Sequence, residues 1–170
     1  MKRSFSVHRL VFAALFCALI CAATLVVQIP LPTGYVHPGD ALCLLAGFFL
    51  PVGDAVLAAA LGSALADLFS GFAVYVPATF LIKGGIALVA HLLLRLITHS
   101  SSTPGRLWSG ALAGCIAGEV QMIGGYFLYE TMLYGAATAA LTLLGNAGQG
   151  AFAVLVAVPL CRALRGYFRR

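Results

Sequence analysis

The sequence predicts an all-α integral membrane protein with six transmembrane helices and both termini in the cytoplasm. Its 170 residues are 62% hydrophobic and 9% charged, whereas soluble domains carry about 25% charged residues. The apolar residues form runs long enough to cross a bilayer, which takes about 20 helical residues. The net charge is +5, but the basic residues lie at the chain ends and in short linkers. That distribution is typical of membrane orientation signals and not of a nucleic-acid-binding surface.

The apolar runs fit a single domain over residues 1–170. We expect spans at about 9–29, 38–51, 53–69, 77–97, 107–129 and 137–161. The stretch 41–69 is apolar throughout but is interrupted by LPVGD at 50–54. It fits either one long kinked helix, which gives five spans, or two short helices that turn at Pro51 to Gly53, which gives six.

The distribution of basic residues favours six spans. With a cytoplasmic N-terminus, every basic residue except Lys83 then falls on the cytoplasmic side. These residues are Lys2, Arg3, Arg9, Arg95, Arg106, Arg162, Arg165, Arg169 and Arg170. Five spans would move Arg106 and the Arg-rich C-terminus outside, against the positive-inside tendency. Spans two and three are then short, roughly 22–25 Å at 1.5 Å per residue, and depend on their neighbours or on local bilayer thinning.

The N-terminal segment resembles a signal peptide at first sight. Its apolar run of about 18–20 residues is longer than the usual 7–15 of a cleaved signal. We therefore expect a retained first span.

The sequence predicts no metal site and no cofactor. The cysteines all lie in apolar runs without ligand spacing and are expected to be packing residues: Cys17, Cys21, Cys43, Cys115 and Cys161. We find no DxxDG pattern, no GxSxG elbow, no HExxH zinc motif and no Walker loop. The sequence therefore supports a membrane enzyme less than a stand-alone transporter, and a purely structural subunit less still.

Polar side chains gather in the outer half of the predicted helices. They are Ser63, Asp67 and Ser70 on span three, Thr79 and Lys83 on span four, Glu119, Tyr126 and Glu130 on span five, and Thr138, Thr142, Asn146 and Gln149 on span six. In the inner half, His91 is the one clear exception. Ionisable groups in hydrocarbon cost about 2.5–3.5 kcal/mol each, so they normally face a cavity or a partner.

Two interpretations of these residues remain open, and they can coexist. The polar groups line a cup that opens to the outside, or Lys83 pairs with Asp67 or Glu119 only to hold helices together. Because the polarity stops halfway through the membrane, the pattern lacks the full polar path of a channel or self-sufficient carrier. It favours a protein that captures a compound from outside.

The outer segments add a loop and a group of aromatic residues. The loop PLPTGYVHPGD at 30–40 is rich in Pro and Gly, and Asp40 is placed to cap span two. The aromatic residues are Tyr35, Phe72, Tyr75, Phe80, Tyr126, Phe127, Tyr129 and Tyr134. They fit an interfacial belt or, above a polar cup, stacking against a flat heteroaromatic ligand.

Two stripes of small residues predict close helix packing. Ala14, Ala18 and Ala22 follow i+4 spacing on span one, and Gly110, Gly114 and Gly118 do so on span five. The alanine stripe fits either internal packing or a docking face for another membrane subunit.

The amino-acid sequence from about residue 36 to 150 resembles that of a known family. The segments HPGD, GSALADLFSG, PATFLIK, GGYFLYE and GNAGQ are similar to those of substrate-binding S components of energy-coupling factor (ECF) vitamin transporters, in the riboflavin-type branch. LPVGD departs from the more usual glycine-rich turn after span two.

The resemblance implies a function and a set of partners. An S component binds a vitamin or precursor from outside and works with a transmembrane coupling subunit and two cytoplasmic ATPases in the cell membrane. It implies that Ala14, Ala18 and Ala22 form the coupling face and that the loop with Tyr35, His37 and Asp40 is a lid. The expected ligand-side residues are Lys83, Glu119, Tyr126, Asn146 and Gln149, to which position on the outer helices adds Asp67, Thr79, Tyr75 and Glu130.

The identity of the ligand stays open at this stage. Pyridoxine-like and pyrimidine-like rings, riboflavin and queuosine precursors all fit. The alternative function is a stand-alone secondary transporter or exporter of a small metabolite.

Overall fold

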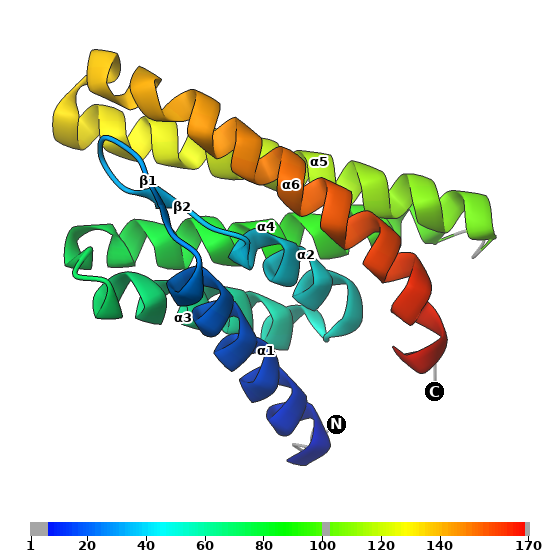
Figure 1. Ribbon diagram of the computed structural model, residues 1–170. Helices are drawn as coiled ribbons and strands as arrows, with labels where there is room; N and C mark the ends of the chain where they lie inside the picture. Colours follow the sequence, from blue (N-terminus) through cyan, green and yellow to red (C-terminus); the bar gives the residue numbers. More distant parts are fainter. Residues whose placement is uncertain (1–6, 100–102, 169–170) are drawn as a thin grey trace.

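The computed structural model describes residues 7–99 and 103–168. In order, these residues form α1 (Val7–Val26), β1 (Ile29–Pro30), β2 (Tyr35–Val36), α2 (Gly39–Phe49), α3 (Val52–Phe69), the 3₁₀ turn η1 (Ala73–Tyr75), α4 (Val76–Thr98), α5 (Pro104–Tyr134) and α6 (Ala136–Phe168) (Figure 1). The predicted basic residues Lys2, Arg3, Arg169 and Arg170 lie outside the described residues, as does the side chain of Arg165.

The predicted all-helical membrane fold is confirmed. Among the described residues, five helices are long and apolar enough to cross a membrane. The sixth, α2, has only 11 residues, or roughly 16 Å at 1.5 Å per residue. α2 is short because the chain that follows the β1–β2 hairpin already runs into the bundle before α2 begins at Gly39. Asp40 in its first turn contacts Lys83, which lies about 10 Å along α4 from the start of that helix.

One turn between helices agrees with the favoured expectation, and another differs from it. The two helices expected over 41–69 are confirmed and the single kinked helix is wrong, since Pro51 has an extended backbone (φ −55°, ψ 142°) between α2 and α3. The outer link expected at 130–136 shrinks to one residue, because α5 continues to Tyr134 and α6 starts at Ala136. Gly135 makes this sharp turn possible with a positive φ of 85°, which glycine adopts without a steric cost.

The glycine stripe of α5 packs against α4. A Cβ added at Gly114 would lie 2.9 Å from the carbonyl oxygen of Ala90, and one at Gly118 would lie 3.3 Å from that of Ile86. The third glycine, Gly110, faces Leu94 of α4. The stripe therefore allows the two backbones to approach closely.

The alanine stripe of α1 faces away from the bundle. This helix packs on α3 and α2 at the edge of the fold (Figure 1), and its buried residues are Phe16, Ile20 and Thr24. Ala14, Ala18 and Ala22 are all exposed on the opposite side. The alternative that these alanines serve internal packing is therefore wrong, and the docking face stays a prediction.

Candidate ligand-binding site

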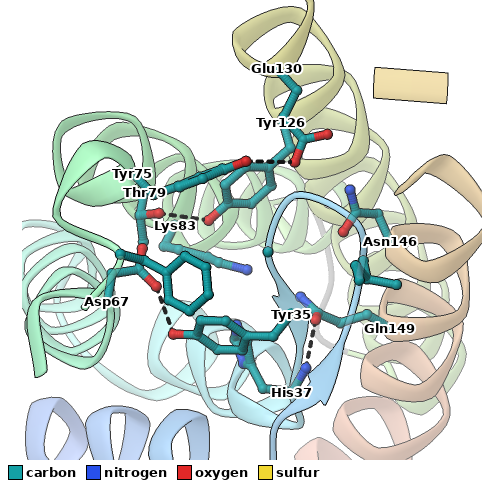
Figure 2. Close-up of a pocket in the computed structure, with 13 residues that line it drawn as sticks. Tyr35, His37, Asp67, Tyr75, Thr79, Lys83, Tyr126, Glu130, Asn146 and Gln149 are labelled. Atoms are coloured by element: carbon teal, nitrogen blue, oxygen red, sulfur yellow. Dashed lines mark hydrogen bonds between the residues drawn. The ribbon is translucent and has the colours of Figure 1, made fainter. Parts of the chain in front are cut away.

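A cavity of about 40 Å³ lies at the end of the bundle where α3 and α5 end and α4 and α6 begin, beneath the β1–β2 hairpin. We call this cavity the cup. The residues that line it are Leu31, Gly34, Tyr35, His37, Asp67, Phe72, Tyr75, Thr79, Lys83, Tyr126, Glu130, Asn146 and Gln149. Figure 2 shows side chains from these separate segments gathered around one space. Every predicted substrate-binding residue except Glu119 is among them.

An ion pair forms the floor of the cup. Lys83 Nζ lies 2.6 Å from Asp40 Oδ1, and the two side chains are 1% and 0% exposed. Gln149 donates a hydrogen bond of 2.6 Å to the other carboxylate oxygen of Asp40. Lys83 also lies 5.2 Å from the ring centre of Tyr126, a favourable cation–π distance. The lysine therefore has two buried contacts and still faces the cavity.

Two expectations about this floor are wrong. Lys83 pairs with neither Asp67 nor Glu119, but with Asp40. Asp40 does not cap α2 and does not belong to the lid, because it sits within the first turn of the helix and makes no capping hydrogen bond there. The physical reason is that the chain runs into the bundle after the hairpin. The first turn of α2, which carries Asp40, therefore lies at the same depth as Lys83.

One wall of the cup is built around Glu130. Its carboxylate accepts hydrogen bonds from Thr33 (3.0 Å), Tyr75 (3.2 Å) and Thr142 (2.5 Å). On the adjacent wall, the hydroxyls of Thr79 and Tyr126 lie 2.9 Å apart. Figure 2 shows the Tyr75–Glu130 and Thr79–Tyr126 contacts side by side. Hydroxyl groups thus fix both walls.

The hairpin covers the cup and contacts several helices. Tyr35 donates a 2.7 Å hydrogen bond to Asp67 of α3, and the backbone N–H of His37 donates one of 2.7 Å to Gln149 of α6. Leu31 packs against Gly145 of α6, where an added Cβ would lie 2.6 Å from its methyl group. With the Thr33 contact to α5, three helices hold this two-stranded cover in place.

The two titratable groups of the hairpin are both uncharged at neutral pH. Burial, and next the charge of Lys83, lower the pKa of His37 to about 3. Its Nδ1 accepts the backbone N–H of Gly39 at 3.1 Å, which fits the neutral ring. Burial, followed by the hydrogen bond to Asp67, raises the pKa of Tyr35. The hairpin therefore adds no charge to the cup.

Carboxylates outnumber cations around the cup. The charge of Lys83 is balanced by Asp40, and Asp67 and Glu130 have no basic side chain within ion-pair distance among the described residues. The side chain of Asn146 faces the same space and makes no hydrogen bond to another described residue. The cup therefore offers an excess of acceptor oxygens together with the amide group of Asn146.

Glu119 does not line the cup. It is 3% exposed and lies against Gly150 of α6, where an added Cβ would lie 3.1 Å from the glutamate Cβ. Neither carboxylate oxygen has a hydrogen-bond partner among the described residues. Gly150 lets α6 close over this side chain, which separates it from the cavity.

The sequence pattern missed part of the cup lining. Leu31 and Gly34 contribute to it but carry no polar side chain that would have marked them, whereas Phe72 belongs to the aromatic residues expected to fit an interfacial belt or stacking above the cup. Thr33 binds Glu130, although it is an ordinary loop residue by composition. The signal that could have found them is the position of the loop over the polar helix ends.

Beneath the floor the bundle is apolar. Apart from Glu119, His91 and the buried amide oxygen of Gln121, the buried side chains described in this half are hydrophobic, and they include Ala87, Ala90, Ala111, Cys115, Ala153, Ala157 and Val158. His91 lies 2.9 Å from the carbonyl oxygen of Gly47, so its ring is used in a helix–helix contact. Within residues 7–99 and 103–168, the polar groups in this half are isolated and form no hydrogen-bonded line that continues the cup.

A helical membrane bundle with a polar cup at one end defines a membrane-embedded binding protein. Residues 4–166 match the family of ECF-type riboflavin transporter S components. The chain belongs to this family and is the substrate-binding subunit of an ECF transporter. The predicted resemblance is thereby confirmed.

The fold is also similar to a solved structure, that of the S component of a bacterial ECF transporter. The TM-score is 0.71 at 22% sequence identity, and the match covers 96% of this chain and 98% of the other. At this identity the likeness establishes the fold. No curated protein matches the chain.

Proposed function

We propose that the cup captures a small, flat heterocyclic compound of the B-vitamin or vitamin-precursor class, and that this compound is neutral or positively charged. The observation that carries the proposal is the charge balance of the cup. Its lysine is already neutralised by Asp40, whereas Asp67 and Glu130 lack a basic partner among the described residues.

An anionic ligand would have to approach Asp67 and Glu130 in a site of low dielectric constant, where like charges repel strongly. A hydroxyl, amine or ammonium group on the ligand would instead donate to these carboxylates. Each carboxylate has about four acceptor positions, so the hydroxyls already bound do not saturate them. The remaining Nζ–H groups of Lys83 and the amide of Asn146 suit a ring nitrogen or a carbonyl oxygen.

The rings around the cup suit a planar ligand. Tyr35 and Phe72 lie 5.1 Å apart between ring centres, and Tyr75 and Tyr126 lie 6.4 Å apart. Aromatic side chains at such distances offer flat apolar faces with polar edges. A heterocycle inserted among them gains stacking contacts, while its polar edge reaches the carboxylates below.

The hairpin acts as a lid in this proposal. Ligand pockets usually have volumes of about 300–1,000 Å³, and the cup encloses about 40 Å³. The hairpin must therefore move for a heterocycle to enter. A two-stranded hairpin is only marginally stable by itself, and the hydrogen bonds of Thr33, Tyr35 and His37 to the helices are the contacts that opening breaks.

The proposal includes a transmembrane coupling subunit and two cytoplasmic ATPases as partners. The exposed alanine stripe of α1, at Ala14, Ala18 and Ala22, supports close docking of a partner helix. A stand-alone transporter needs a polar path through the membrane. The apolar half beneath the cup therefore supports a binding protein that depends on these partners for transport. In this proposal the cup binds its ligand without catalysing a reaction. The carboxylates of Asp67 and Glu130 accept hydrogen bonds from hydroxyl groups that hold them in place, which suits ligand binding.

We place both termini in the cytoplasm and the cup at the outer face of the plasma membrane. Arg9, Arg95, Arg106 and Arg162 support this orientation, because they lie at the end of the helices away from the cup and basic loops favour the cytoplasmic side.

Mass spectrometry of small molecules that co-purify with the detergent-solubilised protein tests the proposal. We expect a neutral or cationic heterocycle at about one molecule per chain, and Asp67→Asn should reduce its affinity. Asp54→Asn, a matched control at the other end of the bundle, should leave the affinity unchanged. A co-purifying carboxylate or phosphate compound would contradict the charge class, and a saturated sugar or lipid would contradict the heterocycle.

A further inference from the structure

A second cavity lies at the opposite end of the bundle from the cup. Its volume is about 270 Å³, several times that of the cup. Four helices contribute to it: Phe48 and Phe49 from α2, Leu94 from α4, Trp108 and neighbouring residues from α5, and Val158 and Arg162 from α6. None of these residues takes part in the substrate site.

The wall of this cavity is apolar apart from one charged side chain. Arg162 places its guanidinium 5.2 Å from the ring centre of Trp108, and the tryptophan is 36% exposed at the cavity rim. Tryptophan favours the boundary between hydrocarbon and headgroups. The cavity therefore combines a hydrocarbon-like interior with a cation at the depth of the membrane interface.

This end of the protein has an excess of positive charge. Arg95 and Arg162 are exposed and have no carboxylate within ion-pair distance among the described residues. The chain contains five acidic residues, and Asp54 is the one at this end. It is already bound to Arg9 at 2.9 Å. An anionic occupant is thus electrostatically complementary to the cavity rim.

We infer that this cavity binds an anionic phospholipid. One acyl chain lies between Leu94, Val158 and the aromatic residues of α2, and the headgroup phosphate contacts Arg162. The membrane supplies an occupant that has both the long apolar part and the negative group that the cavity complements. Basic pockets between transmembrane helices bind anionic headgroups by this same charge complementarity. A helix of a partner protein would fill the apolar part but would leave the arginine without an anion.

Trp108 provides a direct test because it is the one tryptophan of the sequence. The purified full-length chain is reconstituted in vesicles of phosphatidylcholine that contain phosphatidylglycerol with brominated acyl chains, or brominated phosphatidylcholine at the same fraction. Bromine quenches tryptophan fluorescence at short range. The ratio of the two quenching constants reports the preference of the cavity for the anionic lipid.

We expect phosphatidylglycerol to be preferred about fivefold, the effect of about one basic residue at a membrane surface. Arg162→Gln should reduce this ratio to about one. Arg95→Gln removes the same charge from the same end but not from the cavity, so it should keep the preference. Because each ratio is taken within one variant, a change in the intrinsic brightness of Trp108 does not affect it.

Equal quenching by the two lipids in the unmodified protein would overturn the inference. A preference that persists in Arg162→Gln and is lost in Arg95→Gln would overturn it as well, since the lipid would then bind elsewhere. Loss of assembly with the coupling subunit in Arg162→Gln, without any lipid preference in the unmodified protein, would identify the cavity as a protein interface. Native mass spectrometry, which counts retained phosphatidylglycerol molecules in each variant, provides a second measurement independent of fluorescence.

Discussion

Breaking the ion pair at the floor of the cup should destabilise the protein strongly. Asp40→Asn removes the negative partner of Lys83 and leaves a side chain of nearly the same shape. The ammonium group would then remain in the interior, where only 1% of the lysine side chain is exposed. An uncompensated buried charge is much more costly than the loss of an exposed pair.

The magnitude follows from the geometry of the pair. At 2.6 Å and an effective dielectric constant of about 20, two unit charges attract by roughly 6 kcal/mol. Removing one partner of a buried pair typically costs about 3–5 kcal/mol, because part of the attraction offsets the desolvation of the charges. The new amide can accept a hydrogen bond from Lys83, so we expect a loss near 3 kcal/mol.

The assay is reversible unfolding of the detergent-solubilised protein by a denaturing detergent, followed through the fluorescence of Trp108. Asp54→Asn is the matched control. It breaks the Arg9–Asp54 pair, whose side chains are 42% and 26% exposed, and should cost at most about 1 kcal/mol. The double variant Asp40→Asn with Lys83→Met removes both charges and should recover much of the stability that Asp40→Asn loses.

Two results would refute this reasoning. The first is an Asp40→Asn variant whose free energy of unfolding falls no further than that of Asp54→Asn. The second is a double variant that is less stable than Asp40→Asn alone, since that would mean that the buried lysine is not the source of the cost.

Three further predictions concern helix packing, partner docking and pH. Gly114→Ala should destabilise the protein by about 1–3 kcal/mol in the same unfolding assay, since its Cβ would lie 2.9 Å from the carbonyl oxygen of Ala90. A Cβ added at Gly124 of the same helix would meet no atom within 4 Å, so Gly124→Ala should be neutral or slightly stabilising. Equal losses of stability in the two variants would contradict the close packing of α5 on α4. Ala18→Trp should abolish co-purification with the coupling subunit without changing the unfolding midpoint, and a large drop in that midpoint would instead assign the alanine to the protein interior. Because the pKa of His37 is about 3 in the folded chain, against 6.5 ordinarily, the unfolded chain binds a proton between these values that the folded chain does not. Stability should therefore fall as the pH drops from about 6.5 toward 3, by up to about 1.4 kcal/mol per pH unit; His37→Gln should reduce this slope, and an unchanged slope would contradict the assignment.

The helical fold could be predicted from the sequence because its signals are local. Apolar runs and the positions of basic residues act within single segments, and they already favoured two helices over one between residues 41 and 69. The gathering of Thr79, Lys83, Asn146 and Gln149 at one end followed from their depth along predicted helices. Depth is fixed by residue number, so it needs no knowledge of the tertiary contacts.

The partners within the site could not be predicted in this way. Asp40 and Lys83 are 43 residues apart in sequence, and their contact depends on how far the loop enters the bundle. The exclusion of Glu119 from the cup depends on the close approach of α6 at Gly150. Both features come from the packing of three or more segments, which periodicity within one segment does not report.

The most direct test of the account compares binding with transport for the chain alone. The purified protein is reconstituted in sealed vesicles, and binding and accumulation of the co-purified compound are both measured. We predict binding of one compound per chain with no accumulation, and ATP-driven accumulation once the coupling subunit and ATPases are added. Accumulation by the chain alone would contradict it, because the apolar half beneath Lys83 and Asp40 would then have to pass the ligand.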